Sequence, residues 1–227
     1  MRYHLMRVLG QSITLGAHSN TVQLDGAGAS PATVSINSAT SGSTIILMRG
    51  GAHADNADPT DNKGNTLTQR GTDQGYAGGL WSGFGLEIWG VTDADGGSSH
   101  VLSTTKSHTD WEISLVMLEV LGGSTITTAQ GNAAAAGAGV PYSSPSIVMP
   151  GPGLVFAIAS GDGDAATDDQ TLTPSDGWTM VESSFLADTA YVPFAVASRY
   201  YSAAGTYSLQ WTPTVNQGSA MFMVGVS

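Results

Sequence analysis

The chain has 227 residues, of which 41% are hydrophobic, and this is enough for one large β-sandwich or two small domains. Charged residues make up only 11% and the formal net charge is −11, which argues against a phosphate-binding groove for nucleic acid and against docking on an anionic membrane. Because there is no cysteine, disulfides and thiolate metal sites are excluded, and thirty glycines disfavour a helical protein.

Residues 1–12 form a short basic arm. The arm contains no apolar segment of the signal-peptide type, and no run in the chain approaches the roughly 20 apolar residues of a spanning helix. If the protein leaves its cell, we therefore expect it to do so by lysis or assembly. The arm is interpreted either as a frayed terminus or as a docking arm, whose contacts would come from Arg2, Leu5, Arg7 and Leu9.

The chain that follows has the pattern of β-strands. In ATVSINSA, Val34 and Ile36 lie on one face, as expected of a half-buried strand. The runs 41–51 and 111–120 are apolar at both parities and predict strands in the core. Between them, FGLEIWGVTD and VLSTTKS predict a hairpin around the turn DADGG (residues 93–97).

The pattern restarts after a segment rich in small residues. IVMPGPGLVFAIASG matches STIILMRGG, FAVASRYYSAAGTYSLQW matches LEIWGVTDADGGSSHVLS, and SAMFMVGV matches EISLVMLEV, in the same order. We predict an all-β fold: a two-sheet antiparallel β-sandwich of jelly-roll type, built from two similar halves of about five strands. Residues 13–227 would form one domain, with halves at about 33–122 and 146–227 and a crossover at 123–145. Two separate small sandwiches are the alternative.

One loop has the composition of a calcium site. Four carboxylates lie within eight residues, and calcium prefers several oxygen ligands from one flexible loop. The loop lacks the EF-hand register, and solvated acidic loops are common between strands. We expect no cofactor, with Ca²⁺ as the alternative, held by Asp162, Asp164, Asp168 and Asp169. Weaker versions of a metal site are His53 with Asp55 and Asp58, and Asp61 with Asn62 and Asn65.

No residue set predicts an enzyme. A nucleophile elbow of the G-x-S-x-G type is absent. Glycoside hydrolysis would need two carboxylates across a cleft, and the candidates are Glu87, Glu112 and Glu119 on predicted strands. Because Glu112 and Glu119 have opposite parity, they would lie on different faces. We therefore expect a non-enzymatic protein, with a hydrolase as the least favoured hypothesis.

Aromatic residues could supply a sugar-stacking platform, although tryptophans in strands usually pack between sheets. Trp81 lies in a glycine-rich loop and is the aromatic side chain that we expect to be exposed. A carbohydrate-binding adhesin or tail-fibre module is accordingly the alternative function, with the loops 73–85 or 162–169 meeting the glycan.

Several motifs resemble a known group of proteins. They are D-x-x-G-N-T-x-T (Asp61 to Thr68), followed by D-A-D-G-G, and in the second half G-W-T (Gly177 to Thr179) and Y-x-x-A-G-T-Y (Tyr201 to Tyr207). This punctuation of turns and strands resembles the jelly-roll-like β-sandwich structural proteins of tailed phages and prophages, which are head-decoration, fibre or tail-attached proteins. The resemblance covers roughly residues 33–227.

The resemblance implies a function without naming functional residues. It implies a virion structural protein, most concretely a capsid decoration protein on the head surface that docks by its N-terminal arm and apolar edges. Its partners would be other virion proteins, above all the major capsid protein, and further copies of itself in a homo-oligomer, for which we expect a trimer. Neither nucleic acid nor a membrane is expected as a partner.

Overall fold

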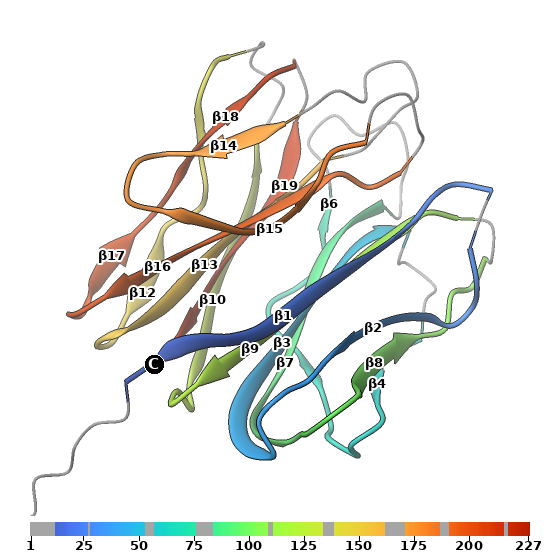
Figure 1. Cartoon of the computed structure of the whole chain (residues 1–227). Coiled ribbons are helices and arrows are strands. Elements are labelled where there is room, and N and C mark those ends of the chain that lie inside the picture. The colour runs from blue at the N-terminus through green and yellow to red at the C-terminus, as the bar shows by residue number, and fades with distance from the viewer. Residues whose placement is uncertain are drawn as a thin grey trace, which may run out of the picture.

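In the computed structural model, the part of the chain whose structure is described is folded entirely into antiparallel strands and their connections (Figure 1). No helix occurs in this part, so none is long and apolar enough to cross a membrane. The described residues are 12–26, 28–52, 57–75, 84–108, 111–133, 139–161, 171–186, 191–215 and 218–227.

A large sheet is formed by strands from the first half of the chain. They are β1 (Thr14–Gln23), β3 (Ser41–Ala52), β5 (Thr68–Gln69), β6 (Gln74–Gly75), β7 (Phe84–Asp95) and β9 (Ile113–Leu121). Their order is β1-β9-β3-β7-β5, and β6 also pairs with β7. A smaller sheet of the order β2-β8-β4 accompanies it and consists of β2 (Ala32–Ile36), β4 (Thr60–Asp61) and β8 (His100–Thr104).

A second large sheet comes entirely from the later strands. They are β10 (Ile126–Ala133), β13 (Gly153–Ser160), β15 (Thr179–Ser184), β16 (Phe194–Tyr201) and β19 (Ser219–Val226), in the order β10-β19-β13-β16-β15. Two small sheets, β11-β18-β14 and β12-β17, accompany it. They consist of β11 (Tyr142–Ser143), β12 (Ile147–Met149), β14 (Leu172–Pro174), β17 (Gly205–Tyr207) and β18 (Gln210–Pro213).

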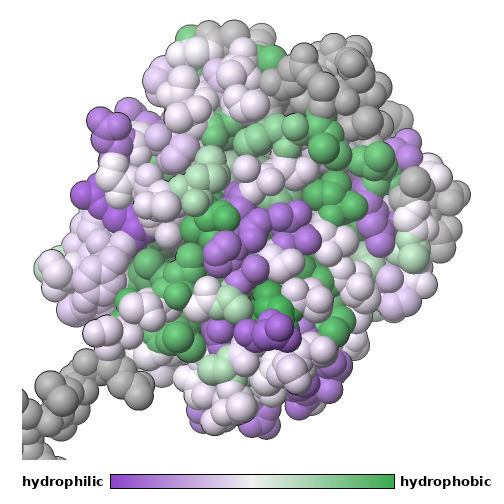
Figure 2. Space-filling model, viewed as in Figure 1, coloured by the Kyte–Doolittle hydropathy of each residue, from purple (hydrophilic) through white to green (hydrophobic). Residues whose placement is uncertain are grey.

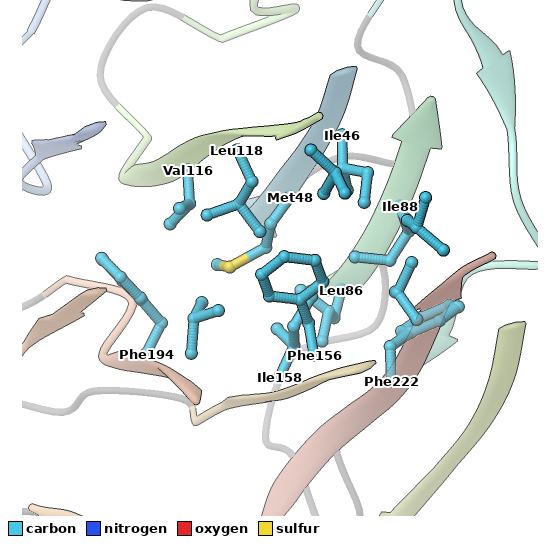
Figure 3. Close-up of a cluster of buried hydrophobic side chains, with 14 of the residues drawn as sticks. Ile46, Met48, Leu86, Ile88, Val116, Leu118, Phe156, Ile158, Phe194 and Phe222 are labelled. Carbon is cyan, nitrogen blue, oxygen red and sulfur yellow. The ribbon is translucent and has the colours of Figure 1, made fainter. Parts of the chain in front are cut away.

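The two large sheets pack against each other through a central core, which is the principal contact between the two halves. Figure 3 shows Ile46, Met48 and Leu118 from the first large sheet pointing toward Phe156 and Phe222 from the second. All are completely buried. The complete set is Ile46, Met48, Leu86, Ile88, Val116, Leu118, Val120, Leu154, Phe156, Ile158, Phe194, Val196, Ala220, Phe222, Val224 and Val226.

Each large sheet also has a core on its other face. Between the first large sheet and β2-β8-β4 lies the first outer core, which includes Val34, Leu47 and Leu102. Between the second large sheet and its two small sheets lies the second outer core, which includes Trp211 and Met223. Four layers of sheet therefore enclose three cores, and each half is a sandwich in its own right.

This layering explains the strands that are apolar at both parities. Successive side chains of a strand point to opposite faces. In β13, Phe156 contributes to the central core and its neighbours Val155 and Ala157 to the second outer core. In β9, Leu118 contributes to the central core and Met117 to the first outer core. Along these strands, both faces of each large sheet are therefore buried.

The prediction of an all-β antiparallel sandwich is confirmed, but the number of sheets is larger than expected. We expected two sheets, and the described residues form five. Residues 126–133, which we placed in the crossover, form the edge strand β10. The stretch that passes from one large sheet to the other is residues 122–125, which is tied down by hydrogen bonds from Thr44 Oγ1 to Gly123 O (2.7 Å) and from Ser124 N to Ser227 O (3.0 Å).

Candidate functional site

A serine, a histidine and an aspartate converge in the first half. His100 Nε2 lies 2.8 Å from Asp61 Oδ2, and His100 Nδ1 lies 2.9 Å from Ser38 Oγ. The side chains of His100 and Asp61 are both 0% exposed. With a neutral ring, Nε2–H donates to the carboxylate, so Nδ1 accepts the hydroxyl proton of Ser38. The hydrogen bonds thus join a hydroxyl, an imidazole and a carboxylate in series, as in a hydrolytic triad.

The hydrogen bonds around this relay join three connections of the sandwich. The Asp61 carboxylate also accepts from Lys63 N (2.6 Å) and Asn65 Nδ2 (2.8 Å). Asn65 exchanges hydrogen bonds with the backbone of Asp95, at 2.7 Å to its carbonyl and 2.9 Å from its amide. Side chains thereby connect the segments 37–40, 61–65 and 95–100, and we call this set the loop-end network.

The loop-end network uses its donors for internal bonds. A hydrolase needs backbone N–H groups that are free to bind an oxyanion beside the nucleophile. Gly97 N instead donates to Ser38 Oγ itself (3.1 Å), and Ala39 N donates to Glu119 Oε1 (2.6 Å). Ser38 is half-buried. In the described part of the chain, these two backbone donors near Ser38 are already bonded to protein groups, and the hydrogen bonds of the network join the loops to one another.

A second polar cluster is buried under the first large sheet. Arg49 on β3 and Glu87 on β7 are directly paired in register and are 2% and 4% exposed. Arg49 Nε donates to Glu87 Oε2 at 2.6 Å, and its Nη1 donates to Thr104 Oγ1 (2.6 Å) and Ala57 O (2.8 Å). Trp89 Nε1 donates to the same carboxylate oxygen at 3.1 Å, and its ring lies 5.7 Å from the guanidinium carbon.

Burial raises the pKa of the Glu87 carboxyl above its ordinary value. The charged Arg49 and the hydrogen bond from Trp89 lower it, and the charge of Asp73 raises it, but loss of hydration is the largest effect. Raised carboxyl pKa values are common at catalytic acids. This carboxylate, however, is held by a guanidinium and an indole from the same sheet, so the cluster is built as an internal brace.

Of the three carboxylates considered for glycoside hydrolysis, Glu87 and Glu119 do not face each other across a short gap. Glu119 is paired in register with Ile45, whereas Glu87 is paired with Arg49, four residues further along β3. At about 3.3 Å per residue, this separates the two positions by roughly 13 Å, beyond the roughly 5 to 10 Å of glycosidase pairs. Glu119 is also occupied, because Oε2 accepts Ala17 N at 3.0 Å.

Most of the residues that we predicted to act as a site lie outside the described residues. This holds for the acidic loop with Asp162, Asp164, Asp168 and Asp169, and for Trp81. It also holds for His53 and Asp55 and for the docking residues of the arm, which are Arg2, Leu5, Arg7 and Leu9. The structure therefore leaves these predictions untested.

The weaker metal hypothesis, on Asp61, Asn62 and Asn65, falls in the loop-end network. Each of these side chains bonds to protein groups: Asn62 Nδ2 donates to Ser99 O (2.9 Å) and its Oδ1 accepts Val101 N (2.8 Å). Within the described ranges, no group of three or more His, Asp or Glu side chains could hold a metal ion.

Aromatic side chains gather at one end of the second half. Tyr201 stacks on Tyr207 with ring centroids 3.5 Å apart, and Trp178 meets Tyr201 edge-on at 6.2 Å. The Arg199 guanidinium lies 5.1 Å from the Tyr201 ring. Burial raises the pKa of the Tyr201 hydroxyl, an effect that Arg199 opposes. Tyr201 and Tyr207 are half-buried and Arg199 is exposed, so this aromatic cluster reaches the surface.

A shallow hollow of about 340 Å³ lies where β1, β3 and β9 begin or end. Its lining is uncharged and contains four hydroxyl side chains, two glycines and the exposed Leu121. Ser43 is 1% exposed, and its Oγ has no hydrogen-bond partner. The lining residues are Ser12, Thr14, Ser41, Gly42, Ser43, Leu121 and Gly122.

The sequence did not reveal the pairing of Ser38 with His100 or of Arg49 with Glu87. Ser38 and His100 are 62 residues apart, and no local motif marks either of them. Arg49 did carry a weak indication, because it is a charged residue inside an apolar run. A charge in such a run requires a partner when it is buried.

Comparisons with known proteins give no relationship for this chain. No protein-family model, no curated protein and no solved structure matches it.

Proposed function

We propose that the protein is a non-enzymatic virion structural protein, most concretely a decoration protein of a tailed-phage capsid. The observation that carries the proposal is the loop-end network. In it, the side chains of the motif residues Asp61 and Asn65 form hydrogen bonds that join loops to one another, and they do not line a cavity. Such a network makes a rigid scaffold. The surface role then falls to the arm and to the sandwich edges.

We also propose that each half is a jelly roll and that the chain is a tandem repeat. In a jelly roll, one sheet has the first strand beside the last, then the third and the sixth, and the facing sheet holds the second, seventh and fourth. The order β1-β9-β3-β7 opposite β2-β8-β4 fits this scheme, as does β10-β19-β13-β16 opposite β11-β18-β14. The finer fold therefore supports the resemblance to phage sandwich proteins.

The register supports the repeat at the level of residues. Leu86 and Ile88 of β7 and Phe194 and Val196 of β16 occupy matching places in the central core. The positions that match Glu87 and Trp89 are then Ala195 and Ala197. Alanines at the matching places provide no carboxylate for the same ion pair in β16, so the pair of Arg49 and Glu87 is a brace of one copy and not a feature needed by the repeated fold.

The surface offers contacts of the kind that a decoration protein needs. On the face shown in Figure 2, hydrophobic residues lie in several groups separated by hydrophilic ones. The large exposed hydrophobic side chains among the described residues are Trp111, Leu121, Val140, Val148, Leu186 and Tyr200. Small apolar groups of this kind suit contacts with a capsid lattice and with further copies of the chain, for which we retain a trimer as the expectation.

A carbohydrate-binding adhesin or fibre module is the second candidate. It is favoured by the aromatic cluster of Trp178, Tyr201 and Tyr207 with the exposed Arg199. Sugars stack on aromatic faces, and these rings lie at a surface. Glycan-array binding that disappears in Tyr207→Ala or Trp81→Ala and persists in Val148→Ala would support this function over the first.

The experiment for the first candidate is reattachment to particles. Purified capsids that lack this protein are mixed with the full chain or with a variant lacking residues 1–12, and the particles are pelleted through sucrose. We expect the full chain in the pellet and the shortened chain in the supernatant. If the full chain also stays in the supernatant while remaining folded, the decoration function is wrong.

A further inference from the structure

The two halves of the chain are joined by one short connection and by no shared sheet. Every ladder of the described strands pairs β1 to β9 among themselves or β10 to β19 among themselves. Between β9 and β10 lie only residues 122–125, which read Gly-Gly-Ser-Thr. Gly122 has a φ of 82°, a left-handed conformation that glycine adopts without strain. We call residues 122–125 the hinge.

Each half keeps a core of its own when the central core is set aside. The first outer core is made only of residues from the first half, and the second outer core only of residues from the second half. A half that is separated from the other therefore retains a two-layer sandwich. What it exposes is one apolar sheet face, which in the closed chain supplies its share of the central core.

The contact between the halves has the character of a contact between two similar subunits. At one edge, Asn20 of β1 donates to Glu182 of β15 (2.5 Å). At the other edge, the Gln130 side chain of β10 accepts a hydrogen bond from Thr72 N (2.8 Å) and donates one to Thr72 O (2.9 Å). Asn20 lies opposite Val116 on β9, and Gln130 lies opposite Phe222 on β19, so the two amides occupy matching positions. Such a reciprocal arrangement is that of a two-fold interface.

We propose that the same faces join two copies of this chain, with the first half of each packed on the second half of the other through an opened hinge. The contacts in this reciprocal dimer are those already made in the closed chain. The exposed faces are too apolar to remain uncovered in water, so an opened chain must find such a partner. The proposal does not depend on the virion function.

The hinge decides between the closed chain and the dimer. Within one chain, the second half is present at an effective concentration in the millimolar range, so an intact hinge favours closure at micromolar protein. From Leu121 to Ile126 there are five residue steps, which reach at most about 18 Å. Packed sheets lie about 10 Å apart, so removing Gly122 and Gly123 leaves roughly 11 Å and no slack for the turn.

The absence of cysteine allows a direct test with disulfides between the halves. A Cβ placed on Gly50 of β3 would lie 3.0 Å from Ser160 Oγ of β13. This is close to the distance from a Cβ to the far sulfur of a disulfide. The variants are Gly50→Cys, Ser160→Cys and the double variant, all as full-length chains.

The single variants are mixed, unfolded in denaturant, and refolded under oxidising conditions at high protein concentration. We expect a disulfide-linked species of twice the 23.2 kDa chain mass that appears in the mixture and in neither variant alone. The double variant, refolded dilute, should give an internal disulfide and so validates the geometry. If the double variant closes while the mixture gives only monomers, the proposal is wrong.

Deletion of Gly122 and Gly123 provides a second, cysteine-free measurement. We expect light scattering coupled to size exclusion to give twice the chain mass at micromolar concentration, with unchanged far-ultraviolet circular dichroism. A folded monomer would overturn the proposal. Should the double cysteine variant stay reduced, this measurement decides.

Discussion

The Nη2 atom of Arg49 lies 2.5 Å from Oε2 of Glu87, with both side chains almost fully buried between the first large sheet and its covering layer. Burial of this ion pair has a desolvation cost, because two charges have left water. In the repeat that we propose, alanines of β16 take the places of Glu87 and Trp89. On that proposal, the pair braces one sandwich and is not required by the fold type.

Removal of Arg49 should leave the buried charge of Glu87 without a counter-charge and so destabilise the protein. In Arg49→Met, Glu87 keeps the indole of Trp89 but loses its counter-charge, and we expect the free energy of unfolding at pH 7 to fall by about 3 to 5 kcal/mol. The double variant Arg49→Met/Glu87→Met should recover most of the loss, because an apolar pair of similar volume removes the buried charge. Urea denaturation measures both. Equal losses in the single and double variants would contradict this account.

The loss in Arg49→Met should depend on pH. Burial raises the pKa of Glu87 in the folded protein, so its stabilising contribution is present below the unfolded pKa near 4.5 and is lost as pH rises through the folded pKa. Without Arg49, which lowers this pKa, the folded pKa rises further, so stability is lost over a wider pH range and the total loss is larger. The difference in stability between wild type and Arg49→Met should therefore grow from pH 4 to pH 7, and the double variant Arg49→Met/Glu87→Gln should show no such growth.

Much of the fold follows from the sequence because strand burial is a local pattern. The runs around Leu47 and Leu118 are apolar at both parities, and this correctly indicated strands buried on both faces. It did not indicate what covers each face, so one two-sheet sandwich and two sandwiches packed together looked alike. The edge strand β10 was missed because its sequence, ITTAQGNA, has one large apolar residue and is only half-buried.

The candidate site was less predictable for a physical reason. The bond from His100 to Asp61 spans 39 residues, and the bond to Ser38 spans 62. Convergence over such distances is decided by the packing of β2 against β8, which no short motif records. The turn residues themselves, Asp61 and Asn65, were recognised, but their partners were not.

The loop-end network should contribute measurable stability. The Asp61 carboxylate accepts hydrogen bonds from Lys63 N, Asn65 Nδ2 and His100 Nε2. In Asp61→Asn, an NH₂ group replaces one of its two oxygens, so a buried donor faces another donor. We expect a loss of about 2 to 3 kcal/mol and faster amide hydrogen exchange at residues 95–99. The exposed Asp176→Asn is the matched control, with a change within about 0.5 kcal/mol. A loss no larger than in the control would show that the network is incidental.

Two turn glycines should be limited by backbone conformation and not by space. Gly64 and Gly177 have φ values of 86° and 84°. A Cβ on Gly64 would meet nothing within 4 Å, and one on Gly177 would meet only the flexible end of Arg199. We expect Gly64→Ala and Gly177→Ala each to cost about 1 to 2 kcal/mol, and the asparagine variants to cost less. Thermal denaturation measures these losses, and an alanine variant as stable as the wild type would contradict the prediction.

The central core should hold the halves together. Phe156 is completely buried there, and Phe156→Ala should lower the free energy of unfolding by about 3 to 5 kcal/mol. Val148 lies in the same half but is 65% exposed, so Val148→Ala serves as the control, with a change within about 0.5 kcal/mol. Losses of equal size would mean that the packing between the large sheets is not what stabilises the molecule.

The most direct test of the proposed function is quantitative mass spectrometry of density-purified virus particles from cells that express this chain. A capsid decoration protein should be present at a copy number comparable to that of the major capsid protein. It should also remain with the particles after washing in moderate salt. Particles that are complete and infectious but contain no copy of the chain would contradict the account.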